Sequence, residues 1–242
     1  MAAKTAVPPT SEAVDDYLKA ILELSGSSEA QVTSNALAER LGVRAPSVTG
    51  MLQKLALQRP PLVLYERHRG ARLTTAGKRR AWELVRHHRL LELFLHDILK
   101  YSWDEVHEEA ERLEHFISER FEDRVAALLG DPDRDPHGHL IPHRNAANHF
   151  SDEIPLLEWT PGVPAVISSV DDRDPAALRD LERLNLGPRA ELVIEQKNSK
   201  NSLLIRVKGH SQQIRLSCQL AGHLLVLPSP SSDSPPTSIP LR

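Results

Sequence analysis

The sequence predicts a mainly α-helical protein with a small β part: two helical modules, the first ending in a hairpin, and a C-terminal β-barrel. Two observations lead to this class. Apolar residues recur at helical spacing over most of the first 130 residues, whereas from about residue 160 they gather in short strand-like runs.

The single cysteine, Cys218, excludes an internal disulfide framework and is typical of a reducing compartment.

The first module is predicted to be a winged helix-turn-helix. Ser11 is a plausible N-cap for the first helix, and the third helix begins with Pro46, which is tolerated in a first turn. Two short helices joined by a tight turn and followed by a hairpin with a basic tip make this motif. The expected ranges are 11–24, 34–41 and 46–57 for the helices and 62–65 and 72–74 for the hairpin strands.

The second module is predicted to be helical, and the last to be a small barrel. One long helix should begin near Thr75 and run through the apolar stretch that ends near residue 99, and another should cover 104–129 without interruption. Short β-like runs follow, with one inserted helix over 174–186. The predicted boundaries are 1–10 for a disordered N-terminus, 11–80 and 81–145 for the two modules, 146–159 for a linker, 160–227 for the barrel and 228–242 for a disordered Pro/Ser-rich tail.

The charge distribution points to two different partners. The formal net charge is −3, but residues 33–80 hold ten lysines and arginines against two glutamates, which gives +8. Residues 81–160 hold eight basic and eighteen acidic residues, which gives −10, and nine of the twelve histidines. A basic block followed by an acidic, histidine-rich block indicates contact with a polyanion and capture of a cation.

Small polar and basic residues at the N-terminal end of the third helix predict contacts with DNA bases, and arginines on the hairpin predict phosphate or minor-groove contacts. The alternative is a merely solvated basic face. The residues expected to meet DNA are Arg44, Ala45, Pro46, Ser47, Thr49, Gln53, Lys54, Arg67 and Arg69, with Arg72 as a further candidate on the hairpin.

Histidines and glutamates recur at helical spacing in the acidic block, which predicts a divalent-cation site. His107, Glu111, Glu114 and His115 should share a helix face that extends to Ser118. His88 and Glu92 lie four residues apart on the preceding helix. A solvated acidic face is the alternative, and it is the interpretation kept for Glu105, Glu108 and Glu109.

These pieces, in this order, resemble the diphtheria toxin repressor family of metal-dependent transcription regulators, which includes iron and manganese regulators. The matching stretches are DDYLKAILEL, ALAERLGVRAPSVTGMLQKL, TTAGKR, HRLLELFL, VHEEAERLEHFIS and DPHGHLIP. The resemblance covers about residues 11–145 and, more loosely, 160–227. It implies a homodimer joined through the helices after the winged module, a double-stranded DNA operator, and a C-terminal SH3-like barrel.

The resemblance also implies two groups of metal ligands. The primary site would use Asp16 with Glu111, Glu114 and His115. A second site would draw on His88, Glu92 and His107 with help from the C-terminal domain. In some manganese members a Cys-Pro-His element supplies ligands; here it reads Asp135-Pro136-His137, and a later aspartate, Asp171 or Asp172, joins it. His139, His143 and His149 are interpreted as polar loop residues.

Carboxylates at Asp16 and Glu111, where iron-type members carry Met and Cys, favour Mn²⁺, with Fe²⁺ as the alternative and Zn²⁺ less favoured. Lys19 stands where single-module manganese regulators carry a glutamate, which predicts separated metal sites rather than a close pair. No apolar run approaches the length of a membrane span, and we expect a cytoplasmic repressor of metal-uptake genes.

Two other functions are alternatives to this one. A metal-independent winged-helix regulator would use the acidic helices only for dimer contacts. A metallohydrolase is disfavoured because the sequence has no H-E-x-x-H, GxSxG or P-loop pattern, so no enzyme activity is expected.

Overall fold

A computed structural model describes residues 12–26, 30–144, 152–198, 201–210 and 212–229. The expected disordered ends, the N-cap Ser11, His149 and part of the expected linker lie outside these residues. The chain forms two compact units. The first unit comprises residues 1–99, 108–133 and 140–150, and the second comprises 100–107, 134–139 and 151–242.

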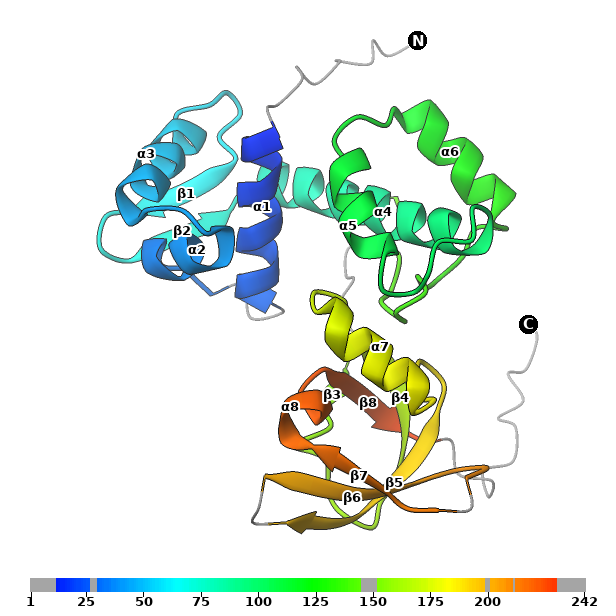
Figure 1. The fold of residues 1–242 in the computed structure, drawn as a ribbon. Helices are drawn as coiled ribbons and strands as arrows, with labels where there is room; N and C mark the ends of the chain where they lie inside the picture. The colour runs from blue at the N-terminus through cyan, green and yellow to red at the C-terminus, as the bar shows by residue number, and fades with distance from the viewer. Residues whose placement is uncertain (1–11, 27–29, 145–151, 199–200, 211, 230–242) are drawn as a thin grey trace, which may run out of the picture. The chain divides into compact units, whose positions relative to one another are not determined.

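The first unit begins with the expected winged helix-turn-helix (Figure 1). Thr33 caps the second helix by accepting a hydrogen bond from the backbone of Ala36, and Gly42 ends that helix in the left-handed region at φ 64°. The elements are α1 (Glu12–Ser25), α2 (Ser34–Leu41), α3 (Ala45–Ala56), and the antiparallel strands β1 (Val63–Glu66) and β2 (Gly70–Leu73).

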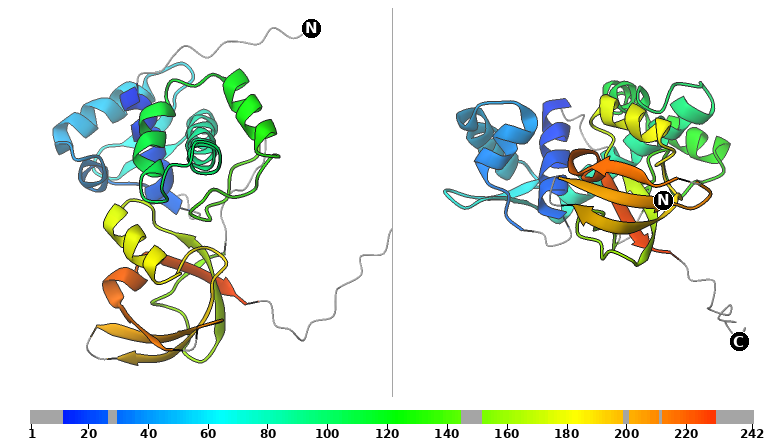
Figure 2. Two further views of the ribbon diagram at one scale, coloured as in Figure 1. Left: turned by 45° about the vertical axis from the view of Figure 1, so that its right-hand side comes forward. Right: turned by 60° about the horizontal axis from the view of Figure 1, so that its bottom comes forward.

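The core of the winged module draws one apolar face from every one of these elements. Leu18, Ile21, Leu37, Leu52 and Leu55 are fully buried within it. Burying each such side chain stabilises the fold by about 1.5–3 kcal/mol. Helix α1 therefore belongs to the winged module by its packing, although it also faces α4 (Thr75–Asp97), as Figure 2 shows.

The remaining helices of the first unit depart from expectation in one respect. The stretch 104–129 is not one helix but two, α5 (Val106–Leu113) and α6 (Glu119–Leu128). The break occurs because the Ser118 hydroxyl accepts a hydrogen bond from the backbone of Phe121 and so begins a new helix. The prediction that the ligand face runs on to Ser118 along one helix is therefore wrong.

The second unit is built on one antiparallel sheet, whose strand order is β3-β8-β4-β5-β6-β7. Helix α7 lies against this sheet (Figure 2). Its Leu178 and Leu181 share a core with the sheet and with Trp103. The two-residue strand β3 and the short helix α8 were not expected from the sequence. The elements are β3 (Ile154–Pro155), β4 (Pro164–Val170), α7 (Pro175–Arg183), β5 (Glu191–Asn198), β6 (Ser202–Val207), β7 (Ile214–Ser217), α8 (Cys218–Ala221) and β8 (Leu224–Pro228).

Within the described residues, none of the helices is long and apolar enough to cross a membrane.

Candidate metal centres and nucleic-acid interface

The N-terminal end of α3 presents an exposed polar surface. Arg44 precedes the helix in extended conformation, and Pro46 lies in its first turn. Of the residues expected to contact bases, Arg44, Pro46, Ser47, Gln53 and Lys54 are exposed, and Ala45 and Thr49 are half-buried. Their neighbours Val48, Leu52 and Leu55 are buried, so α3 turns its apolar stripe inward.

The hairpin presents Arg67 and Arg69 at its exposed tip. Arg69 forms an exposed ion pair with Glu66 at 3.2 Å, so its charge is partly compensated. Gly70 follows at φ 113°, and a Cβ there would lie 2.2 Å from the backbone oxygen of Val32. Only glycine fits this position, which ties the hairpin to the segment before α2.

Side chains from α1 and from the turn after α5 converge in the first unit. The Nε2 atom of His115 lies 3.2 Å from Oδ1 of Asp16 and 3.8 Å from Oε1 of Glu114. Glu114 is buried and the His115 side chain is 9% exposed, whereas Asp16 is half-exposed. Carboxylate and imidazole groups gathered in this way can act together on one divalent cation.

Glu114 and His115 reach this position because α5 ends just before them. The backbone N–H of Glu114 still donates to Ala110, but that of Phe116 donates to Leu113, so the chain tightens into a turn. His87 of α4 holds the turn, because its Nδ1 donates to the backbone oxygen of Glu114 at 3.2 Å.

Lys19, the residue that stands where single-module manganese regulators carry a glutamate, also contacts Glu114. Its ammonium lies 2.9 and 3.0 Å from the two carboxylate oxygens of Glu114 and 3.1 Å from Oε1 of Glu111. Burial lowers the pKa of Lys19, but the charges of Glu114 and Glu111 outweigh burial and raise the pKa above its usual value. The lysine is therefore charged.

His88 joins the same group of side chains. Its Nδ1 lies 2.5 Å from Oε2 of Glu114, and its Nε2 lies 2.9 Å from Oε1 of Glu92, one turn along α4. Burial and the charge of Lys19 lower the pKa of His88, but the two carboxylates outweigh them and raise it to about 9. One ligand atom from each of His88, Glu111 and Glu114 lies within 4.8 Å of the others.

Asp15 is a residue of this cluster that sequence reasoning missed. It is buried and receives two hydrogen bonds from Arg80 near the start of α4, at 3.0 and 3.1 Å. It also lies 3.7 Å from Nδ1 of His115. The carboxylates of Asp15 and then Asp16 raise the pKa of His115 to about 10 against the effect of burial. In the sequence, Asp15 is marked only by its position next to the candidate ligand Asp16.

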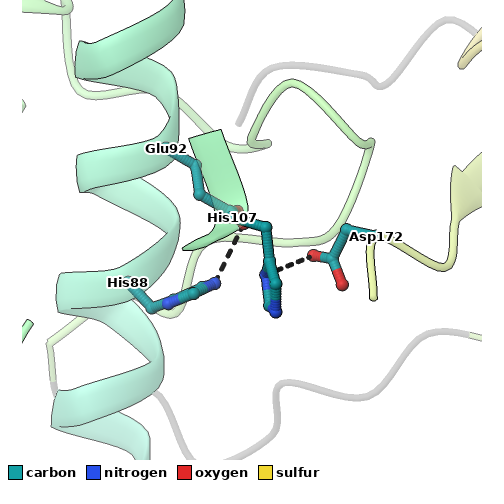
Figure 3. A group of neighbouring side chains, drawn as sticks. All are labelled: His88, Glu92, His107 and Asp172. Atoms are coloured by element: carbon teal, nitrogen blue, oxygen red, sulfur yellow. Dashed lines mark hydrogen bonds and ion pairs between the residues drawn. The ribbon is translucent and has the colours of Figure 1, made fainter. Parts of the chain in front are cut away.

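In the second unit, Asp172 is the centre of a different cluster. Its Oδ2 lies 3.5 Å from Nδ1 of His107, 3.8 Å from that of His137 and 3.6 Å from that of His139. His139 also lies 3.2 Å from Asp135, although its sequence context suggested only a polar loop residue. Figure 3 draws the His107–Asp172 pair of this unit and the His88–Glu92 pair of the first.

His137 is oriented by its surroundings. It is fully buried, and its ring stacks on Trp103 with centroids 5.3 Å apart. Its Nε2 donates to the backbone oxygen of Trp103 at 2.9 Å, which in the neutral ring places the lone pair on Nδ1, the atom nearer to Asp172. A hydrogen bond of this kind is what fixes the tautomer of metal-binding histidines.

The predicted ligands thus fall into two sets. The first unit gathers Asp16, His88, Glu92, Glu111, Glu114 and His115 around α4 and the turn after α5. The second unit gathers His107, Asp135, His137 and Asp172, with His139 added. Each set consists of carboxylates and imidazoles, the donors that Mn²⁺ and Fe²⁺ accept, so both fit a divalent cation.

Three family models match the chain. Residues 9–71 match the N-terminal DNA-binding domain of iron-dependent repressors, and 74–143 match their metal-binding and dimerisation domain. Residues 154–228 match the FeoA domain, in agreement with the expected SH3-like barrel.

Similar proteins include iron and manganese regulators. The iron-dependent repressor IdeR of Mycobacterium leprae is 30% identical over 209 residues, which cover 80% of this chain and 88% of that protein. The diphtheria toxin repressor of Corynebacterium diphtheriae is 34% identical over 126 residues, 52% of this chain and 54% of that protein.

Solved structures agree with these sequence matches. A manganese-dependent transcriptional repressor in complex with manganese superposes with a TM-score of 0.81 at 33% identity, over 89% of this chain and all of the other. ScaR with bound Zn²⁺ gives a TM-score of 0.74 at 30% identity, over 89% of this chain and 99% of that one. The chain belongs to the diphtheria toxin repressor family of metal-dependent DNA-binding transcriptional repressors, which are not enzymes.

Proposed function

We propose that this protein is a cytoplasmic homodimer that binds a pseudo-palindromic operator when loaded with a divalent metal, and that it represses metal-uptake genes. One observation carries the proposal. Helix α1 contributes Leu18 and Ile21 to the core of the winged module and, from the same helix, Asp16 to the cluster with Glu114 and His115. A cation bound there would join the DNA-binding module to the turn after α5.

We assign the primary site to Asp16, Glu111, Glu114 and His115. When bound, the ion would supply the positive charge that holds helix α1 and the turn after α5 together. The protein's own part is to hold the ligands in place: Asp15 orients His115, and His87 fixes the backbone at Glu114. The pKa values of His115 in this site and of His88 beside it are both raised, so these histidines must release protons before they bind a metal.

We assign a second site to His107, Asp135, His137 and Asp172 of the second unit, and His88 with Glu92 of the first unit remains a further pair of candidate ligands. The support comes from the family resemblance and from the pairs within each unit, His88 with Glu92 and His107 with Asp172. His139 is a further candidate ligand, because it meets both aspartates of the second unit.

The metal is proposed to be Mn²⁺, with Fe²⁺ as the alternative. Carboxylate oxygens in place of sulfur favour the harder ion, and a solved relative is a manganese complex at 33% identity. The iron-dependent relatives at 30–34% identity support the alternative.

The DNA contacts are assigned to the end of α3 and to the hairpin. Arg44, Ser47, Thr49, Gln53 and Lys54, with Ala45 and Pro46 for apolar contact with thymine methyl groups, would enter the major groove. Arg67 and Arg69 would reach phosphates or the minor groove. For the homodimer, the exposed apolar residues Phe116, Phe121 and Leu128 near and on α6 offer a surface that a second copy would cover.

The test is a selection of DNA sequences from a random library with and without Mn²⁺, followed by binding titrations on the selected duplex. We expect tight binding with Mn²⁺ and weak binding in chelator. Glu111→Ala and His115→Ala should remove the response to Mn²⁺, whereas His143→Ala, an exposed histidine outside the cluster, should retain it. Equal affinity in chelator would instead favour the metal-independent winged-helix regulator.

A further inference from the structure

The loop that carries His137 is closed by one buried carboxylate, that of Asp135. Its Oδ1 accepts hydrogen bonds from the backbone N–H of His137 at 2.8 Å and from that of His139 at 3.0 Å. Its Oδ2 lies 3.2 Å from Nδ1 of His139, and the side chain has no exposed surface. The backbone completes the loop, because Asp135 donates to the oxygen of His139 at 3.1 Å. Asp135 therefore contacts its own loop through both carboxylate oxygens.

The same loop is fixed to strand β4, close to Asp172. Gly138 has a φ of 90°, and a Cβ there would lie 2.1 Å from a backbone oxygen of β4, so only glycine permits this approach. The backbone oxygen of His137 accepts a hydrogen bond from Val170 at 2.9 Å. Because His137 and His139 flank Gly138, the loop brings two imidazoles to the end of β4, where Asp172 follows.

Three imidazoles converge on one oxygen of Asp172. Its Oδ2 lies 3.5, 3.8 and 3.6 Å from the three Nδ1 atoms, which belong to His107, His137 and His139 in that order. A tetrahedral ion with metal–ligand distances of about 2.0–2.1 Å holds its ligand atoms about 3.4 Å apart, which is close to these separations. These four side chains of the second unit are therefore spaced as one ligand set, and Asp135 is not needed to complete it.

We propose that His139 is a metal ligand of the second site and that Asp135 is a positioning residue, which holds the loop in the shape that brings both imidazoles to Asp172. The family resemblance implies a ligand at position 135 itself. In this chain the imidazole four residues later takes that place, and the carboxylate at 135 acts through the backbone. This assignment deepens the second site proposed above and rests on it.

The experiment places a thiolate at each position and loads the full chain with Co²⁺, which reports a bound thiolate by a charge-transfer band in the near ultraviolet. We expect this band in His139→Cys and not in Asp135→Cys. The natural protein, which contains Cys218, sets the baseline, and His143→Cys, at an exposed histidine outside the cluster, is the matched control and should add no band. A band in Asp135→Cys, or none in His139→Cys, would overturn the proposal.

Melting temperature in chelator separates positioning from ligation without any metal. Asp135→Ala removes the acceptor of two backbone N–H groups and should melt below both the natural protein and His139→Ala. Asp135→Asn keeps an acceptor oxygen and should recover most of the loss. An unchanged melting temperature in Asp135→Ala would contradict the positioning role. If Asp135→Cys does not fold, Asp135→Asn replaces it in the cobalt experiment: it should bind as many Co²⁺ ions per chain as the natural protein, and loss of one ion would overturn the proposal.

The regulatory function can fail separately from this assignment. If DNA binding by the natural protein is independent of metal while His139→Cys shows the cobalt band, the regulatory function fails and the ligand assignment stands. If DNA binding requires metal and His139→Cys shows no band, the ligand assignment alone fails.

Discussion

The two clusters of the chain use the same residue types in opposite proportions. In the first unit, carboxylates dominate, and Lys19 compensates part of their charge. In the second unit, three histidines surround the single carboxylate of Asp172, with Asp135 beside His139. Oxygen-rich sites suit hard ions such as Mn²⁺, whereas imidazoles also suit Zn²⁺ and Fe²⁺. The contrast teaches that two sites in one chain can differ in ion preference.

The largest expected effect is on the first cluster. Glu114→Gln should weaken Mn²⁺ binding by at least about 100-fold, since a ligand matters more than the outer residues whose loss costs 10–100-fold. Because Glu114 contacts Lys19, His88 and His115, DNA affinity in Mn²⁺ should fall to its value in chelator. Calorimetry measures the Mn²⁺ affinity, and fluorescence anisotropy measures the DNA affinity. Glu108→Gln, at an exposed carboxylate of α5, is the matched control, and equal loss in both variants would refute the assignment.

The second-largest effect is expected at Asp15, which we propose positions His115 without binding the metal itself. Asp15→Asn breaks a buried ion pair with Arg80 and should lower the free energy of unfolding by about 3 kcal/mol. It should also lower the pKa of His115, because Asp15 is the leading cause of its rise. Urea unfolding and histidine NMR titration test these two expectations. An unchanged His115 pKa would show that the carboxylate acts only through Arg80.

A smaller effect is expected from the second cluster. Asp172→Asn should reduce the bound metal by one ion per chain and weaken Zn²⁺ binding more than Mn²⁺ binding, while DNA binding in excess Mn²⁺ persists within about 10-fold. Competition dialysis with both ions measures the preference. Asp174→Asn keeps the side-chain oxygen that caps α7 and leaves the cluster alone, so it serves as the control. Loss of all DNA binding in Asp172→Asn would contradict the separation of the two sites.

The smallest effect is a dependence on pH. His88 and His115 have pKa values raised to about 9 and about 10 from 6.5, so they stabilise the metal-free fold fully below pH 6.5. That contribution is lost as the pH rises through 9 to 10. The melting temperature in chelator should therefore decline between pH 6.5 and 9, and Mn²⁺ affinity should increase over the same range. Glu111→Gln keeps both histidines and should show the same decline; a flat profile in the natural protein would contradict the protonated histidines.

Local patterns in the sequence were enough to predict the winged module. The cap at Thr33, the left-handed Gly42 and the alternation of the hairpin are all short-range signals, and the structure confirms the elements they predict. The break between α5 and α6 was missed because apolar spacing continues across it, whereas the Ser118 cap ends the helix. The partners of Lys19 lie 69 to 95 residues away, which no periodicity reveals.

His87 gives the turn after α5 a further significance. Its Nδ1 holds the backbone of Glu114, and its Nε2 lies 3.1 Å from Glu122 on α6, a carboxylate that also pairs with Arg86 and Arg144. One imidazole thus connects the segment that carries the metal ligands to the helix whose outer face bears Phe121. His87 therefore links the proposed ion site to the surface proposed for a second copy, and we expect His87→Ala to let metal binding and dimer formation occur independently of each other.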